Sequence, residues 1–187
     1  MSAPFDVLAV SGSLRAGSAN TGLLHMAQRL APPELRMTHD DSIGELPYYN
    51  ADIDVPDTLP DVVRAWRERV AACDALFLAA PEYNFGPSAV LKNAIDWASR
   101  PMGAAALTGK VITIVTSGGK GGGSRVQAGL TDILTLLGNT LVQEPQITVA
   151  LGYQRIDADG TTTDQDVEQL VAARMANVLT ALNGHSG

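Results

Sequence analysis

Serine, threonine and glycine are concentrated in Ser11–Thr21, and the stretch also carries one arginine. Hydroxyl groups donate hydrogen bonds to phosphate oxygens, and glycine lets backbone N–H groups come close to an anion. Arg15 adds a permanent cation that can hold a phosphate in bidentate fashion. A helix that begins near Asn20 or Thr21 would point its positive end at the same place. This chemistry predicts a site for a terminal phosphate.

Comparison with two common nucleotide-binding patterns reduces the number of possible ligand classes. The stretch has no Gly-Lys-Ser/Thr at Walker spacing, and it lacks the Gly-x-Gly-x-x-Gly of dinucleotide-binding folds. These absences favour a mononucleotide. On composition alone, an ordinary strand-to-helix loop with a serine or asparagine cap remains an alternative.

A second unusual loop, Pro81–Pro87, follows the continuous apolar run Ala75–Ala80. Tyr83 and Phe85 offer flat aromatic surface for a ring, and Asn84 offers a donor and an acceptor for a polar ring edge. The loop therefore predicts a platform for a planar heterocycle. The alternative is a tight, proline-bounded turn with a capping asparagine.

A third loop, Ser117–Ser124, is dominated by glycine and follows the β-branched run Val111–Thr116. Glycine suits a close approach of backbone to a ligand, although a merely flexible loop has the same composition. Lys120 and Arg125 could attract the phosphates of an incoming nucleotide, or they could be solvated charges.

Two of these loops resemble the signatures of one family, the NADPH-dependent FMN reductases, which include quinone, azo-dye and chromate reductases. Gly12-Ser13-Leu14-Arg15 with Ser18 and Asn20 resembles GSLRxxSxN, and the PEYN of Pro81–Asn84 followed by LKNAIDW resembles the second signature. In one departure, Pro87 stands one position earlier than the family proline, and Ser88 takes its place. Arg15 favours this family over true flavodoxins.

The resemblance implies FMN as cofactor and a set of residues that bind it. The FMN phosphate would be held by Ser11, Ser13, Arg15, Ser18, Asn20 and Thr21. The ring would lie against Pro81, Glu82, Tyr83, Asn84 and Phe85, with Ser117, Gly118 and Gly119 contacting the ring or the ribityl chain. Tyr48–Tyr49 would be a weaker candidate on the substrate side.

The same resemblance implies a reaction, in which NADPH or NADH gives a hydride to the flavin and a small-molecule acceptor then takes the electrons. Quinones, azo compounds, metal oxyanions and free flavin are all possible acceptors. We name no catalytic side chain, because the cofactor carries the chemistry.

Two alternatives to a reductase remain, a flavodoxin-type electron carrier that oxidises no nicotinamide and a relative that has lost the flavin. Relatives commonly form homodimers or homotetramers.

The elements that must position these loops alternate along the sequence. Strands are expected at Phe5–Val10, Leu35–His39, Ala75–Ala80 and Val111–Thr116, with a fifth among the extended segments Thr140–Val142 and Gln146–Leu151. Apolar residues recur at helical spacing in four segments between the strands, Leu23–Leu30, Leu59–Cys73, Val90–Ala98 and Val126–Leu137. A last helix, about Asp164 to Leu182, places Val167, Leu170, Val171, Val178 and Leu179 on one face.

This alternation implies parallel strands, because parallel neighbours need a crossover connection. We expect residues 1–187 to form one flavodoxin-like domain, a doubly wound α/β sandwich of five strands in the order 2-1-3-4-5 with helices on both faces. Ligands of such folds bind at the carboxyl ends of the strands, where the three loops would meet.

Composition excludes some functions. A net charge of −7 argues against nucleic-acid binding, and we expect no metal site, because the histidines are scattered. The single cysteine, Cys73, fits a reducing cytoplasm and is expected to be a core residue. No signal peptide or membrane span is expected.

Four residues that follow the second loop are interpreted as holding a loop and a subunit interface: Lys92, Asn93, Asp96 and Trp97.

Overall fold

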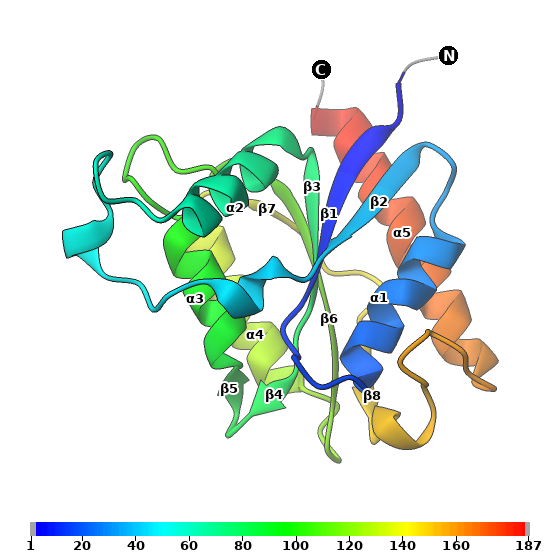
Figure 1. The fold of residues 1–187 in the computed structure, drawn as a ribbon. Coiled ribbons are helices and arrows are strands. Elements are labelled where there is room, and N and C mark those ends of the chain that lie inside the picture. The colour runs from blue at the N-terminus through cyan, green and yellow to red at the C-terminus, as the bar shows by residue number, and fades with distance from the viewer. Residues whose placement is uncertain (1–2, 186–187) are drawn as a thin grey trace.

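A parallel sheet runs through the centre of the computed structural model, which describes residues 3–185 (Figure 1). Its strands are β1 (Phe5–Ser11), β2 (Leu35–Asp40), β3 (Ala75–Ala79), β6 (Val111–Gly118), β7 (Thr140–Val142) and β8 (Thr148–Ala150). Their order is β2-β1-β3-β6-β7, and β8 also pairs with β6. Counted along the chain, this is the predicted order 2-1-3-4-5, so the flavodoxin-like fold is confirmed.

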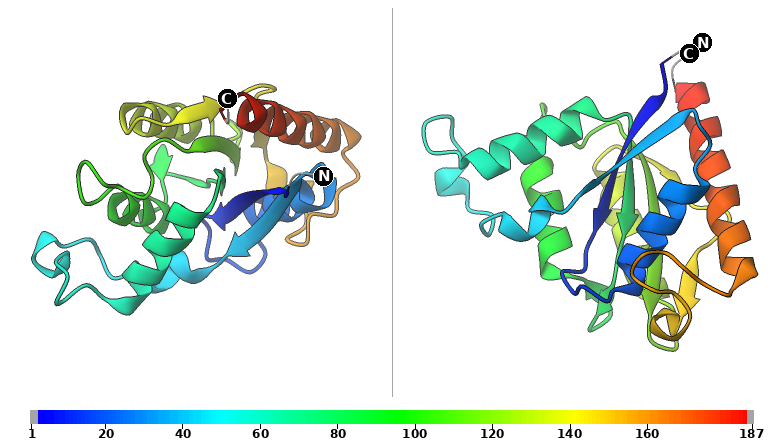
Figure 2. Two further views of the ribbon diagram at one scale, coloured as in Figure 1. Left: turned by 90° about the horizontal axis from the view of Figure 1, so that it is seen from above. Right: turned by 45° about the vertical axis from the view of Figure 1, so that its right-hand side comes forward.

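Helices cover both faces of the sheet. One face carries α1 (Ala19–Leu30) and α5 (Gln165–His185), and the other carries α2 (Asp61–Ala72), α3 (Ala89–Ala98) and α4 (Ser124–Leu136), as Figures 1 and 2 show. Alternate strand residues point to opposite faces, so Val7 and Ala9 pack in one core while Leu8 and Val10 pack in the other. Within residues 3–185, no helix combines the length and the apolar character that a membrane-spanning helix needs.

The loops contain more regular structure than their composition predicts. The third loop was expected to begin at Ser117, but β6 continues through Gly118, because Ser117 and Gly118 pair with Val149 and Ala150 of β8. The second loop holds a small antiparallel hairpin, β4 (Glu82–Tyr83) with β5 (Gly86–Pro87). Short 3-10 turns lie at η1 (Ser42–Glu45), η2 (Ala51–Ile53) and η3 (Gly152–Gln154).

The buried face of α5 differs from the expected one. Leu170 is 37% exposed, whereas Arg174 is fully buried among apolar side chains. The Arg174 guanidinium donates to Oγ1 of Thr113 at 2.8 Å and to the carbonyl of Val142 at 3.1 Å, and it also reaches the carbonyl of Pro145. Burial lowers the pKa of Arg174 to about 10. The cation thus ties α5 to β6 and to the connection that precedes β8.

Candidate functional site

A pocket of about 210 Å³ lies where β1, β3 and β6 end, and all three predicted loops contribute to it. Its lining comprises Ser13, Arg15, Ser18, Ala19, Asn20, Pro81, Glu82, Tyr83, Ser117, Gly118, Gly119 and Tyr153. Most of the residues singled out from the sequence are therefore brought together. Ser11, Thr21, Asn84 and Phe85 do not line the pocket. Ala19 and Tyr153 do, and neither was expected from the sequence.

The first loop ends in the N-terminus of α1, where backbone donors remain unused. Ser18 caps the helix by accepting from the N–H of Thr21 at 3.5 Å. None of the hydrogen bonds in the described part of the chain uses the N–H groups of Ser18, Ala19 or Asn20. Arg15 is exposed, lines the same pocket and forms no ion pair with any described residue. Free N–H groups at a helix N-terminus beside a cation fit a phosphate group.

Three predicted phosphate ligands of the first loop have other partners in the structure. The side chain of Asn20 is buried and bonds at both ends to the backbone of Ser117, 2.9 Å from its carbonyl and 2.8 Å from its N–H. Ser11 and Thr21 share a hydrogen bond of 2.8 Å between their hydroxyl oxygens. These side chains connect parts of the protein, because their hydrogen-bonding groups face protein atoms.

The hairpin of the second loop turns through two residues with positive φ, Asn84 at 50° and Phe85 at 69°. Positive φ at both central positions is the geometry of a two-residue type I′ turn. Asparagine tolerates this conformation but phenylalanine does not, so Phe85 is strained. The Arg125 guanidinium lies over the Phe85 ring, 4.5 Å from its centroid, and holds the tip of the hairpin against α4. Tyr83, half exposed, is the aromatic side chain of this hairpin that lines the pocket.

The third loop approaches β8 so closely that side chains would not fit. A Cβ on Gly122 would lie 2.7 Å from the carbonyl oxygen of Thr148, and Gly122 also has a φ of 63°. A Cβ on Gly152 would lie 2.1 Å from Oγ of Ser117. This contact places η3 beside β6, and Tyr153 of η3 lines the pocket. No local sequence pattern predicts that Tyr153 lines the pocket, because its position depends on the pairing of β8 with β6 in the tertiary fold.

Two of the residues interpreted as structural hold the long loop that precedes α2. Asn93 accepts from the N–H of Tyr49 at 2.8 Å and donates to the carbonyl of Pro47 at 2.9 Å, and Nε1 of Trp97 donates to the same carbonyl at 2.7 Å. The Tyr49 ring packs edge-on against Trp97, 4.8 Å between centroids. Lys92 and Asp96 form an ion pair on the surface. Tyr48 is exposed and does not line the pocket.

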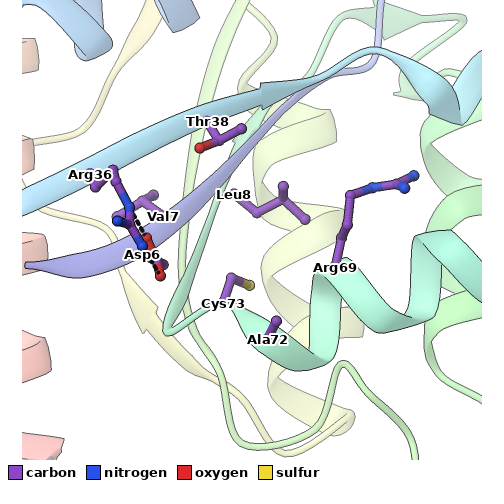
Figure 3. Close-up of a pocket in the computed structure, with 8 residues that line it drawn as sticks. All are labelled: Asp6, Val7, Leu8, Arg36, Thr38, Arg69, Ala72 and Cys73. Carbon is purple, nitrogen blue, oxygen red and sulfur yellow. Dashed lines mark hydrogen bonds and ion pairs between the residues drawn. The ribbon is translucent and has the colours of Figure 1, made fainter.

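A second hollow, of about 340 Å³, lies on the flank of the sheet between β1, β2 and the end of α2 (Figure 3). The ion pair of Asp6 with Arg36 stands on one side, and Cys73 and Ala72 lie on the other. Burial raises the pKa of the Cys73 thiol, as expected for a core cysteine. None of the candidate site residues lines this hollow. Among residues 3–185, no group of three metal-binding side chains occurs.

Comparison with known proteins identifies the family. The pattern of the family described as NADPH-dependent FMN reductase matches residues 5–154. The chain is 39% identical over 181 residues to an NADPH:quinone oxidoreductase of Arabidopsis thaliana, covering 94% of this chain and 89% of that protein. It is 37% identical over 176 residues to an NAD(P)H-dependent FMN reductase of Pseudomonas aeruginosa, covering 94% of each. The structure is similar to FerB of Paracoccus denitrificans, a flavoenzyme NAD(P)H:(acceptor) oxidoreductase, with a TM-score of 0.85, 30% identity and coverage of 97% and 98%. The chain therefore belongs to the NADPH-dependent FMN reductase family.

Proposed function

We propose that this protein is an FMN-dependent oxidoreductase that takes electrons from NADPH or NADH and passes them to a small quinone. The observation that carries the proposal is the pocket at the ends of β1, β3 and β6, which combines unused N–H groups and a free arginine with aromatic surface. When bound, FMN would supply the redox chemistry, because a flavin ring can accept two electrons from a nicotinamide and pass them to an acceptor.

The first loop would hold the phosphate. The N–H groups of Ser18, Ala19 and Asn20 converge at the start of α1, and the cation of Arg15 lies at the same pocket. Both favour a doubly charged group over a neutral one. The backbone of Gly118 and Gly119 lines the same pocket without side chains and would let the ribityl chain or ring lie close.

The rim of the pocket supports a planar, partly apolar acceptor. Tyr83 and Tyr153 line the pocket and are 53% and 61% exposed, and Leu14, on the first loop, is 64% exposed. Exposed apolar side chains beside a pocket are typical of a binding surface. The Arabidopsis relative is named for quinone reduction, which agrees with this choice of acceptor.

Anaerobic spectroscopy of the FMN-loaded protein tests the function. We expect NADPH or NADH to bleach the flavin absorbance and a simple benzoquinone to restore it, with one quinone reduced for each nucleotide oxidised. The protein with FMN but no nucleotide is the control. A flavin that neither nucleotide bleaches would contradict the proposal and would favour an electron carrier.

We also propose that the protein works in the cytoplasm as a homodimer or homotetramer. Its single cysteine, buried Cys73, fits a reducing compartment. Tyr48 and Met102, each 83% exposed, are large apolar side chains that a subunit contact would cover. Light scattering at several protein concentrations measures the mass, and a monomeric mass at every concentration would contradict the assembly.

A further inference from the structure

Glu82, in the PEYN sequence of the second loop, forms hydrogen bonds to a distant helix that the sequence pattern does not predict. Its Oε2 accepts hydrogen bonds from the backbone N–H groups of Arg125 and Val126, both at 3.1 Å. These two groups belong to the first turn of α4, and Glu82 lies 43 and 44 positions earlier in the sequence. The carboxylate of the second loop therefore caps the helix that follows the third loop.

Helix α4 depends on this distant cap because its own sequence supplies none. The residue at the cap position is Gly123, which has no side chain to accept a hydrogen bond, and the first turn of α4 contains no acidic residue. The remaining N-terminal donors are satisfied by backbone, since Ser124 donates to Gly121 and Gln127 donates to Gly123. With Glu82 in place, the N-terminus of α4 has no unused donor in the first turn.

The N-termini of α1 and α4 differ in whether their backbone N–H groups are free, and the Glu82 cap causes this difference. Helix α1 begins at the pocket, and α4 begins beside Glu82, a residue that lines the pocket. The N-terminus of either helix would attract an anion if its N–H groups were free. The N–H groups of Ser18, Ala19 and Asn20 at α1 are unused by any described residue, whereas those at the start of α4 are taken. A single anionic group entering this pocket is thus directed to α1.

We propose that Glu82 is a positioning residue, whose carboxylate fixes the hairpin to the N-terminus of α4 and so sets the spacing of the second and third loops on either side of the flavin. The contact of Arg125 with Phe85 joins the same two segments from the other end of the hairpin. Tyr83 lies between the two joints, and it lines the same pocket as Gly118 and Gly119. The inference rests on the proposed function, because it assigns Glu82 a role in FMN binding.

A matched pair of variants separates position from charge. Glu82→Asp keeps the charge but shortens the side chain by one methylene, so its carboxylate no longer reaches α4. Glu82→Gln loses the charge but keeps the length and an oxygen acceptor. If position matters, the Asp variant should bind FMN at least about tenfold more weakly than the unchanged protein, and the Gln variant should stay within about threefold. Glu68→Ala, at an exposed position of α2, is the control and should bind as the unchanged protein does.

Two measurements read the result. Quenching of FMN fluorescence gives the dissociation constant, and amide hydrogen exchange of the protein without FMN gives the protection of Arg125 and Val126. We expect both amides to lose protection in the Asp variant and to keep it in the Gln variant. Exchange of the strand amides of β1 and β3 shows that each variant is folded.

The outcomes are distinguishable. Lost protection at Arg125 and Val126 with unchanged FMN affinity would overturn the positioning role. Weaker binding in the Gln variant than in the Asp variant would overturn it in favour of a charge effect. An unchanged protein that binds no FMN would overturn the proposed function and the positioning role with it, while amide exchange would still decide whether Glu82 caps α4.

Discussion

Asn20 and Ser117 lie 97 positions apart in the sequence and are joined by two hydrogen bonds, in which the side-chain amide of Asn20 pairs with the backbone N–H and carbonyl of Ser117. Asn20 belongs to α1 and Ser117 to β6, so the pair joins the N-terminus of α1 to the strand that leads into the third loop. Both residues are buried. The amide thus gives Ser117 the two hydrogen bonds that a neighbouring strand would give, beyond the last β3–β6 pair, Ala79 with Val115.

Replacing Asn20 by Asp tests these two hydrogen bonds, because the side chain keeps almost the same shape. The carboxylate can still accept from the N–H of Ser117, but it cannot donate to the carbonyl and would face it with a negative charge. We expect the variant to lose about 1–3 kcal/mol of unfolding free energy, because a buried carbonyl loses its partner. Urea denaturation measures this loss. Asn50→Asp is the control, since the Asn50 side chain only accepts a hydrogen bond and is exposed. Equal stability of the two variants would contradict the role of Asn20.

Arg15→Ala should weaken FMN binding without affecting the fold. Arg15 is exposed and makes no ion pair with any described residue, so its removal costs the folded protein little. A charged hydrogen bond to phosphate is worth about 1.5–3 kcal/mol, which corresponds to roughly 10-fold to 100-fold in the dissociation constant. Fluorescence titration with FMN measures the effect, and thermal unfolding checks the fold. Arg64→Ala, which removes an exposed charge on α2, is the control. An unchanged FMN affinity would refute the phosphate assignment.

The histidine pair predicts a dependence of stability on pH. Partial burial lowers the pKa of His39, and the neighbouring His25 ring, 5.4 Å away between centroids, lowers it further, while Asp41 and Asp40 act in the opposite direction. The folded protein therefore binds fewer protons than the unfolded chain once the pH falls below the ordinary histidine value of 6.5. Stability from this source is complete above that value and declines as the pH falls through the lowered pKa of His39.

His39→Gln should accordingly flatten the pH profile. We expect the unfolding free energy of the unchanged protein to fall between about pH 7 and pH 5, and that of the variant to fall less. Urea denaturation at several pH values makes the comparison. His185→Gln, at the exposed end of α5, should leave the profile as it is. Parallel profiles for the unchanged protein and His39→Gln would exclude His39 as the source.

Asn93→Ala should release the segment around Tyr48 without changing the FMN affinity. The variant removes the acceptor for the N–H of Tyr49 and one of two donors to the carbonyl of Pro47, while Trp97 keeps the other. We expect faster proteolytic cleavage near Tyr48 and a loss of about 1–3 kcal/mol in stability. Limited proteolysis followed by mass spectrometry locates the cut. Asn183→Ala, at an exposed position of α5, is the control, and cleavage at equal rates would contradict the prediction.

The helices show which structural features local sequence patterns can predict and which they cannot. Apolar spacing located all five main helices, because a buried helical face needs apolar residues three and four positions apart. The same rule failed inside α5, where it placed Leu170 in the core and passed over Arg174. A buried arginine is stable there because the carbonyl groups of Val142 and Pro145 and the hydroxyl of Thr113 surround it. Those groups come from other elements, so no pattern within α5 could reveal them.

The sequence by itself determined the order of strands and helices, the parallel sheet, and the three loops that meet at one edge of it. Each of these follows from local spacing and from the crossover that parallel strands require. Only the tertiary structure decided which polar groups of those loops remain free for a ligand. Asn20 and Glu82 face protein partners, while Arg15 and the N–H groups at the start of α1 do not. The reason is physical: a hydrogen bond depends on the position of its partner, and the partners of Asn20 and Glu82 lie 97 and 43 positions away in the chain.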